Sequence, residues 1–128
     1  MNYKKINTYL GWLIFIIATT VYFITLEDSV SLWDCGEYVT AAYKLEVGHP
    51  PGAPLFMVLG RLASFFADPE YVAVWINRLS ALSSSATILF MFWSITLLVK
   101  KMILRTKETL DQGDKIAILG SAVVGSLA

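Results

Sequence analysis

The chain has 128 residues, of which 56% are hydrophobic and only 16% charged, and its mean hydropathy is +0.62. A soluble domain carries about a quarter charged residues, so one small core cannot absorb this apolar excess. Ten basic residues balance ten acidic ones, which leaves no basic surplus for nucleic acid, and one cysteine excludes an internal disulfide. Composition therefore disfavours a soluble enzyme, a nucleic-acid binder and a disordered chain, and it indicates an integral membrane protein.

Two uncharged stretches, residues 8–26 and residues 79–99, are long enough to cross a bilayer. A helix needs roughly 20 residues to cross about 30 Å of hydrocarbon. Lys4 and Lys5 before the first stretch also resemble the start of a secretory signal peptide. The apolar run is longer than a signal core, however, and no small-x-small cleavage site follows it. We therefore expect an uncleaved first span at 8–26 and a second span at 79–99.

A third apolar run begins after Lys115 and reaches Ala128 without a polar stop. Residues 116–128 are too few to cross a bilayer, so they predict the start of a third span. Residues 100–115 before them are charged and contain a break at Gly113, which indicates a solvated connector with nothing catalytic. We therefore expect 1–128 to be the N-terminal membrane segment of one larger, all-α polytopic domain.

The charges predict the orientation of these spans. Seven of the ten basic residues flank the spans on one side: Lys4, Lys5, Lys100, Lys101, Arg105, Lys107 and Lys115. By the positive-inside rule the N-terminus and the 100–115 loop are cytoplasmic, and loop 27–78 is periplasmic or extracellular. We expect a multi-pass protein of the inner (cytoplasmic) membrane. The outer loop holds seven of the ten acids: Glu27, Asp28, Asp34, Glu37, Glu46, Asp68 and Glu70.

The outer loop is predicted to contain a helix over 34–48. Asp34 and Glu37 have the spacing of a helix capping box. An apolar stripe with helical spacing follows, formed by Tyr38, Ala41, Ala42 and Leu45. Gly48 is expected to end this helix, and His49-Pro50-Pro51-Gly52 prevents its continuation.

A second helix is predicted over 54–66, because Pro54 suits a first helical turn. The residues after Pro54 are nearly all apolar apart from Arg61 and Ser64. The run is short for a span and carries a charge, which favours a helix lying in the membrane interface. Residues 68–70 then form the turn back into the second span.

The outer loop also supplies the candidate functional residues. Asp34 and Glu37 have two compatible interpretations: helix capping, which stabilises a helix by about 1 kcal/mol, or proton acceptance by a carboxylate beside the membrane. His49, the single histidine, is either a structural donor or a functional group whose ring direction the prolines fix. Arg61 and Arg78 either bind a lipid phosphate or extend toward the headgroups.

Three strings of the chain resemble a known family: WDCGE at 33–37, TAAY at 40–43 and GHPPGAPLF at 48–56. The resemblance is to the N-terminal part of a bacterial membrane-protein family of unknown function, related to the eukaryotic protein O-mannosyltransferases. Those enzymes belong to the GT-C class of polytopic glycosyltransferases. The layout is also similar, with a first span, a large outer loop with juxtamembrane helices and a second span.

The resemblance implies transfer of a mannose-like sugar from a polyprenyl-phosphate donor to a hydroxyl of an acceptor protein on the outer face. In GT-C enzymes the first outer loop supplies an acid that acts as general base or orients the acceptor, a role that falls on Asp34 first and Glu37 second. His49 and Pro50 would help shape the donor site, and Arg61 or Arg78 would supply charge near the leaving phosphate. Because Asp34 and Glu37 are separated rather than adjacent, the identity of the base stays open.

The implied partners are membrane lipid, the polyprenyl-phosphate sugar and an acceptor protein, and no nucleic acid is expected. No cofactor is expected, since the lipid-linked sugar is a substrate, and the need for a divalent metal stays open. One histidine excludes a histidine-rich metal site in this segment. The segment lacks most of the spans of such an enzyme, so we expect it to be inactive alone.

A transporter segment or a non-catalytic assembly subunit is the alternative. It explains the hydrophobicity and the topology equally well, but it does not explain why acids, a histidine and prolines gather in the outer loop. A transporter places ionisable groups inside its spans, and 8–26 and 79–99 contain none.

Overall fold

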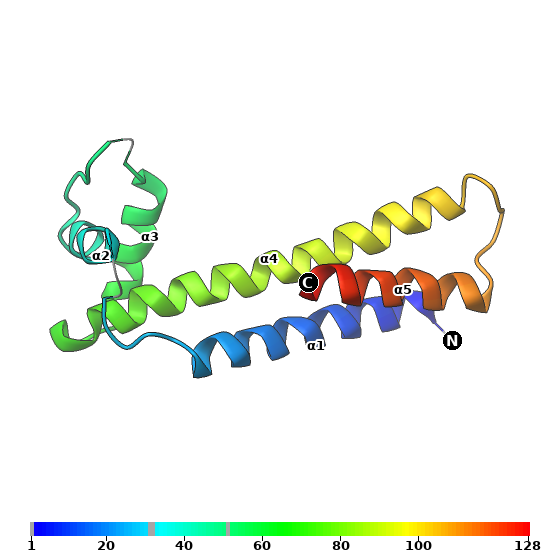
Figure 1. Ribbon diagram of the computed structural model, residues 1–128, viewed down its shortest axis with the longest axis horizontal. Helices are drawn as coiled ribbons and strands as arrows, with labels where there is room; N and C mark the ends of the chain where they lie inside the picture. Colours follow the sequence, from blue (N-terminus) through cyan, green and yellow to red (C-terminus); the bar gives the residue numbers. More distant parts are fainter. Residues whose placement is uncertain (1, 31–32, 51) are drawn as a thin grey trace. The chain divides into compact units, whose positions relative to one another are not determined.

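The computed structural model describes residues 2–30, 33–50 and 52–128, and these ranges contain helices and connecting segments but no strand. The helices in chain order are α1 (Tyr3–Ile24), α2 (Cys35–Lys44), α3 (Pro54–Ser64), the 3₁₀ helix η1 (Pro69–Tyr71), α4 (Val72–Ile103) and α5 (Gln112–Leu127) (Figure 1). The predicted all-α class is confirmed. The chain forms two compact units, residues 1–21 with 84–128 and residues 22–83.

Two helices are long and apolar enough to cross a membrane: Tyr3–Ile24, with 22 residues, and Pro69–Ile103, with 35 residues. They contain the stretches from which spans were predicted, except that 8–26 extends two residues beyond Ile24. Only 17% and 22% of their most apolar windows are buried. The core helix of a soluble protein would be mostly buried, so this exposure favours surfaces that face lipid or further helices.

The first unit packs α1, α4 and α5 around Ile14, Phe92, Leu119 and Ala122. Gly11 allows α1 to approach the ring of Trp93, because a Cβ there would lie 2.5 Å from its Nε1 atom. Trp12 contacts the same ring edge-on, with centroids 5.9 Å apart.

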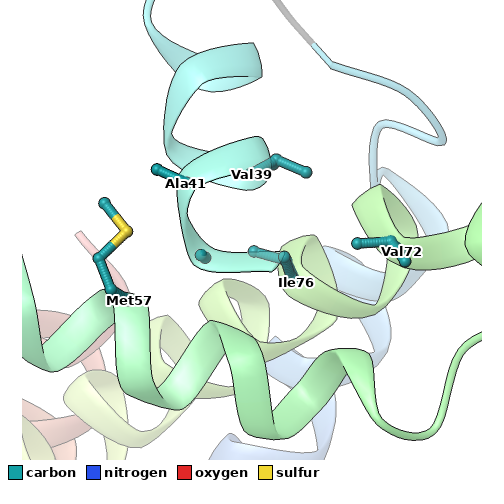
Figure 2. Close-up of a cluster of buried hydrophobic side chains, with 6 residues drawn as sticks. Val39, Ala41, Met57, Val72 and Ile76 are labelled. Atoms are coloured by element: carbon teal, nitrogen blue, oxygen red, sulfur yellow. The ribbon is translucent and has the colours of Figure 1, made fainter. Parts of the chain in front are cut away.

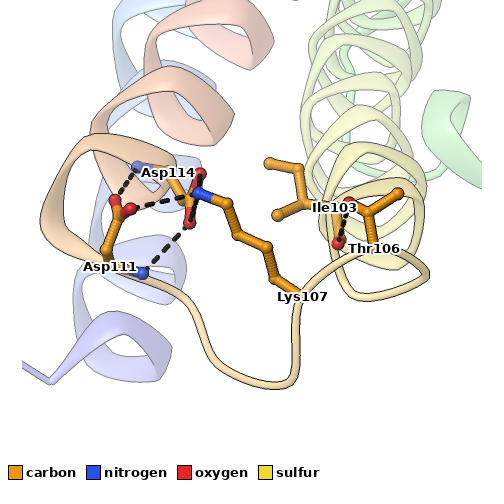
Figure 3. Close-up of polar contacts among 5 residues, drawn as sticks. All are labelled: Ile103, Thr106, Lys107, Asp111 and Asp114. Atoms are coloured by element: carbon orange, nitrogen blue, oxygen red, sulfur yellow. Dashed lines mark hydrogen bonds and ion pairs between the residues drawn. The ribbon is translucent and has the colours of Figure 1, made fainter.

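Helix α5 begins earlier than expected. Asp111 and Asp114 form a capping box, with each side chain accepting the other's backbone N–H at 2.8 and 3.1 Å (Figure 3). Lys107 binds both carboxylates, at 3.1 Å from Asp111 and 2.9 Å from Asp114. The predicted break at Gly113 is wrong, because this cap starts the helix at Gln112 and places Gly113 in the first turn. The connector is accordingly shorter than the predicted 100–115, since α4 continues to Ile103.

The second unit packs α2 against α3 and the first turns of α4 (Figure 2). Its buried side chains are Val39, Ala41, Ala42, Met57, Val72 and Ile76. Gly60 on α3 makes the contact close, because a Cβ there would lie 2.8 Å from the Cβ of Ala42. The chain that leaves α1 is held by Asn77, whose amide donates to the carbonyls of Glu27 and Ser29 at 2.9 and 3.1 Å.

Helix α2 ends at Lys44, so the prediction that it continues to Gly48 is wrong. Leu45 adopts the left-handed conformation, with φ of 56°, and the N–H of Glu46 bonds the carbonyl of Ala41 at 2.9 Å. This closing pattern satisfies carbonyls of the last turn and directs the chain away from the helix. Leu45, the last residue of the predicted apolar stripe, lies beyond the helix and is 58% exposed. Helix α3 also ends slightly early, at Ser64 rather than residue 66.

Candidate acid and histidine site

Asp34, Glu37 and His49 lie together between the start of α2 and the turn that follows it. The Glu37 carboxylate accepts the backbone N–H of His49 through Oε1 at 2.8 Å and lies 2.9 Å from the ring Nδ1 through Oε2. The other ring nitrogen, Nε2, lies 3.7 Å from Oδ2 of Asp34. All three side chains are partly exposed, between 44% and 59%. The histidine ring thus lies between two carboxylates.

The capping box predicted for Asp34 and Glu37 does not form. Asp34 is the N-cap residue of α2, but its ψ is 1° and its side chain makes no cap hydrogen bond. An N-cap residue normally has extended backbone, which places its side-chain oxygen over the first helical N–H groups. Trp33 immediately before it has φ of 65°, a conformation rare for a bulky side chain. The Asp34 carboxylate is therefore not used by the helix.

The turn that carries His49 is fixed by local contacts. The N–H of Gly52 bonds the His49 carbonyl at 2.9 Å, and Gly52 has φ of 73°, which a side chain would disfavour. The Tyr38 ring contacts the His49 ring edge-on at 6.0 Å and also contacts Phe56 of α3. Pro50 lies exposed in this turn, and Pro51 is outside the described residues.

These contacts shift the pKa values of Glu37 and His49. The hydrogen bond from the His49 backbone, followed by the one from its ring, lowers the pKa of Glu37 from its ordinary 4.5. The hydrogen bond to Glu37 and the charge of that carboxylate raise the pKa of His49 above 6.5, and Asp34 adds a smaller attraction. Both shifts favour a charged pair. Glu37 thus holds the turn both through its backbone and through its imidazole.

A polar cleft of about 430 Å³ borders the cluster, with Glu37, Thr40 and Glu46 among its lining residues. It is large enough for a small polar group to approach the Glu37 side of the cluster. Within the described ranges no three acidic, histidine or cysteine side chains are grouped so that they could hold a metal ion.

Arg61 makes its contacts at the other end of α2. Its guanidinium donates to the carbonyl of Tyr43 and lies 5.2 Å from the Tyr43 ring and 4.8 Å from the Phe65 ring. Tyr43 belongs to the last turn of α2, whose carbonyls carry partial negative charge. The structure therefore gives Arg61 a helix-capping contact that sequence did not predict.

Arg78 lies at an apolar groove of about 520 Å³. Its guanidinium lies 5.2 Å from the centroid of the Trp75 ring. Apolar side chains make up the remainder of the groove, namely Phe23, Ala63, Phe66, Leu79 and Leu82. In the part of the chain that the structure describes, neither Arg78 nor Arg61 forms an ion pair or contacts the acid and histidine cluster.

The contact between Glu37 and His49 was not predicted from the sequence. The two residues are 12 positions apart, and no helical or strand periodicity connects them. The signal available was the stiff bend directly after a short helix, which brings the chain back toward the start of that helix.

These features define a helical chain with two membrane-length helices and, between them in sequence, a cluster of two carboxylates and a histidine. Residues 34–128 match the family described as the "Protein O-mannosyl-transferase TMEM260 N-terminal domain". The chain belongs to this family. Its relation to protein O-mannosyltransferases, predicted from the sequence, is confirmed, and it is a membrane protein. The expected bacterial family and the GT-C class stay predictions.

Two curated relatives carry the corresponding name. The chain is 36% identical over 89 residues to the protein O-mannosyl-transferase tmem260 of Dictyostelium discoideum, a match that covers 68% of this chain and 11% of that protein. It is 34% identical over 82 residues to the protein O-mannosyl-transferase TMEM260 of Mus musculus, covering 64% and 12%. The chain thus spans about a tenth of the length of these relatives. No solved structure matches it.

Proposed function

We propose that this chain is the N-terminal portion of a membrane glycosyltransferase that moves a mannose-like sugar from a polyprenyl-phosphate donor to a hydroxyl of an acceptor protein. One observation carries the proposal. In the segment that matches the O-mannosyl-transferase family, Asp34 has a carboxylate that its own helix does not use, 3.7 Å from the ring of His49. A base for an alcohol needs such an available carboxylate.

In the reaction, the acceptor oxygen forms a bond to the anomeric carbon while the bond from that carbon to the donor phosphate breaks. The hydroxyl proton passes to Asp34, and the lipid phosphate leaves with the electron pair of the broken bond. Positive charge near the leaving phosphate would stabilise the transition state. Arg78 is suited to this role, because its groove offers apolar side chains for a lipid chain and its charge is unpaired among the described residues. Arg61, in contact with the end of α2, is the weaker donor-binding candidate.

The chemistry requires the site to lie where a membrane-bound donor presents its sugar. The proposed topology has a cytoplasmic N-terminus, loop 27–78 on the outer face of the inner membrane, and a third span beginning in 116–128. Helix α3 and the residues after it support an interfacial placement of this loop, because Leu55 and Leu62 on the helix are exposed at 72% and 51% and Phe66 beyond its end at 74%. Lipid contact would cover such side chains.

Asp34→Asn in the full-length protein tests the proposal. The substitution keeps the size of the side chain and removes its basicity, and no cap hydrogen bond is lost. We expect sugar transfer from a polyprenyl-phosphate donor to fall about 10²–10⁴-fold, the range typical for loss of a general base. Asp68→Asn is the matched control, because Asp68 also precedes a helix without a side-chain cap bond.

Thermal unfolding of both variants separates loss of chemistry from loss of structure. Near-normal transfer by Asp34→Asn would refute the assignment of the base. If both Asp34→Asn and Glu37→Gln stay active, the acids of the outer loop are structural and the glycosyltransferase mechanism is wrong.

A further inference from the structure

We propose that His49 is a positioning residue for Asp34, and that Glu37 acts on the reaction only through His49. This inference rests on the proposed function, and it changes two roles that the family resemblance implies. His49 would belong to the acceptor side of the site rather than to the donor side. Glu37 would be excluded as the base.

Glu37 has both carboxylate oxygens occupied by the same residue. Oε1 accepts the backbone N–H of His49 and Oε2 contacts Nδ1 of its ring, at 2.8 and 2.9 Å. If Glu37 accepted a proton from an alcohol, its attraction to the imidazole would be lost and its bond to the backbone N–H would weaken, which makes it a poor base. Gly48 borders this carboxylate, since a Cβ there would lie 3.4 Å from Oε1 of Glu37, an ordinary contact distance.

The bond between Nδ1 and Glu37 directs the other ring nitrogen, Nε2, toward Asp34. When the imidazole is protonated, its Nδ1–H donates a hydrogen bond to Glu37, and one N–H remains, at Nε2. That nitrogen lies 3.7 Å from Oδ2 of Asp34. A protonated Nε2–H therefore attracts one oxygen of Asp34 across this distance and leaves the other oxygen for the acceptor hydroxyl. The Glu37 carboxylate fixes the ring orientation of His49, as carboxylates do for the histidines of metal sites.

The surroundings of His49 favour its charged form. From the start of α2 it faces two carboxylates, Asp34 and Glu37, and the neutral phenol ring of Tyr38. Helix α3 contributes the apolar ring of Phe56, which contacts Tyr38. The nearest α3 cation in sequence, Arg61, is bound to the Tyr43 carbonyl. Among the described residues, the ion pairs of His49 are with Asp34 and Glu37 alone, and both acids favour the protonated form of its ring.

This arrangement predicts an alkaline limb in the pH profile of sugar transfer. When His49 loses its proton, the contact with Asp34 loses its charge and Asp34 is no longer held. Glu37→Gln removes the negative charge that favours the imidazolium, so His49 then deprotonates at lower pH. The alkaline limb should therefore move to lower pH in Glu37→Gln, while Glu37→Asp should keep part of the wild-type position.

The experiment measures kcat/KM against pH for full-length wild-type protein, Glu37→Gln, Glu37→Asp, His49→Gln and the double variant Glu37→Gln/His49→Gln. We expect His49→Gln to lose about 10- to 100-fold, the range typical for removal of an orienting partner, and to lose the alkaline limb. The double variant should be within about twofold of His49→Gln, because residues that act through one another are not additive. Glu70→Gln, on η1, is the matched control and should keep the wild-type profile.

The outcomes separate the two proposals. If Asp34→Asn abolishes transfer while Glu37→Gln leaves the alkaline limb unmoved, the positioning role is wrong and the proposed function stands. A shift of the acid limb alone would identify His49 as the base and would also overturn the inference. If wild-type protein transfers no sugar, the proposed function fails first. Fully additive losses in the double variant, with matched thermal unfolding, would show that Glu37 acts independently of His49.

Discussion

Replacing Gly60 by alanine perturbs the contact between α2 and α3. The same contact supports the helix from which Asp34 and Glu37 extend. The new Cβ would lie 2.8 Å from the Cβ of Ala42, whereas carbon atoms pack at about 3.5–4.0 Å. The helices must therefore separate locally by at least about 0.7 Å, the difference between 3.5 and 2.8 Å. Ala42 is fully buried and its Cβ cannot rotate aside.

The cost follows from two opposing effects. Overpacking a core costs about 1–3 kcal/mol, and a rigid obstacle favours the upper half of that range. Alanine in place of glycine within a helix recovers about 1 kcal/mol, which leaves a net destabilisation of about 1–2 kcal/mol. That loss corresponds to a roughly 5- to 30-fold larger open population. Gly36→Ala in α2 is the control, because a Cβ there meets no atom within 4 Å.

Cys35 provides the assay, because this first residue of α2 is half-buried against the same core. We expect its rate of thiol labelling, followed by residue-resolved mass spectrometry of the full-length protein in detergent, to rise about 5- to 30-fold in Gly60→Ala. In Gly36→Ala it should stay near the wild-type rate. Equal or slower labelling in Gly60→Ala would refute close packing of α2 on α3 through this glycine.

Two further predictions concern the turn and the topology. The pKa of His49 is raised above 6.5 and that of Glu37 is lowered below 4.5, so their pairing stabilises the fold fully between about pH 4.5 and 6.5. This contribution is lost above the window as His49 deprotonates and below it as Glu37 becomes protonated. A nitroxide at Val47, which is 97% exposed, should be least mobile inside the window, and mobility independent of pH would contradict the pairing. For topology, impermeant thiol labelling of intact cells is applied to single cysteines at three exposed positions, Glu46, Asp68 and Lys107. The first two should be labelled and the third protected, and labelling of the third alone would reverse the orientation.

The helices could be predicted from the sequence because their causes are local or repetitive. Long uncharged runs identified α1 and α4, and the prolines and glycines identified the bend between α2 and α3. The helix ends were less predictable. Helix α4 includes Arg78, Lys100 and Lys101, which lie outside the predicted span 79–99. Charged side chains end an uncharged run, but they do not end a helix. Helix α2 ends at Lys44 because Leu45 turns left-handed, a conformation that no leucine signals in sequence.

The candidate site was predictable as a set of residues, and its internal pairing was not. The resemblance selected Asp34, Glu37 and His49, and the structure brings these three together. Arg61 shows the opposite case. Its charge suggested a phosphate ligand, but tertiary packing places it against the last carbonyls of α2, where a cation is stabilised by the helix dipole. A charge alone does not distinguish these two partners.

The two Asp-x-x-acid patterns of the chain show why spacing alone does not predict a capping box. At Asp111 the backbone is extended, with ψ of −177°, and Asp114 reaches back to complete the capping box. At Asp34 the ψ of 1° removes the side chain from capping position, and the corresponding acid, Glu37, is taken by His49. The stiff bend after α2 thus competes with the capping box for Glu37. Because the bend prevails, Asp34 keeps a carboxylate that makes no cap hydrogen bond and lies 3.7 Å from the His49 ring, and this is the geometry on which its proposed role as a base depends.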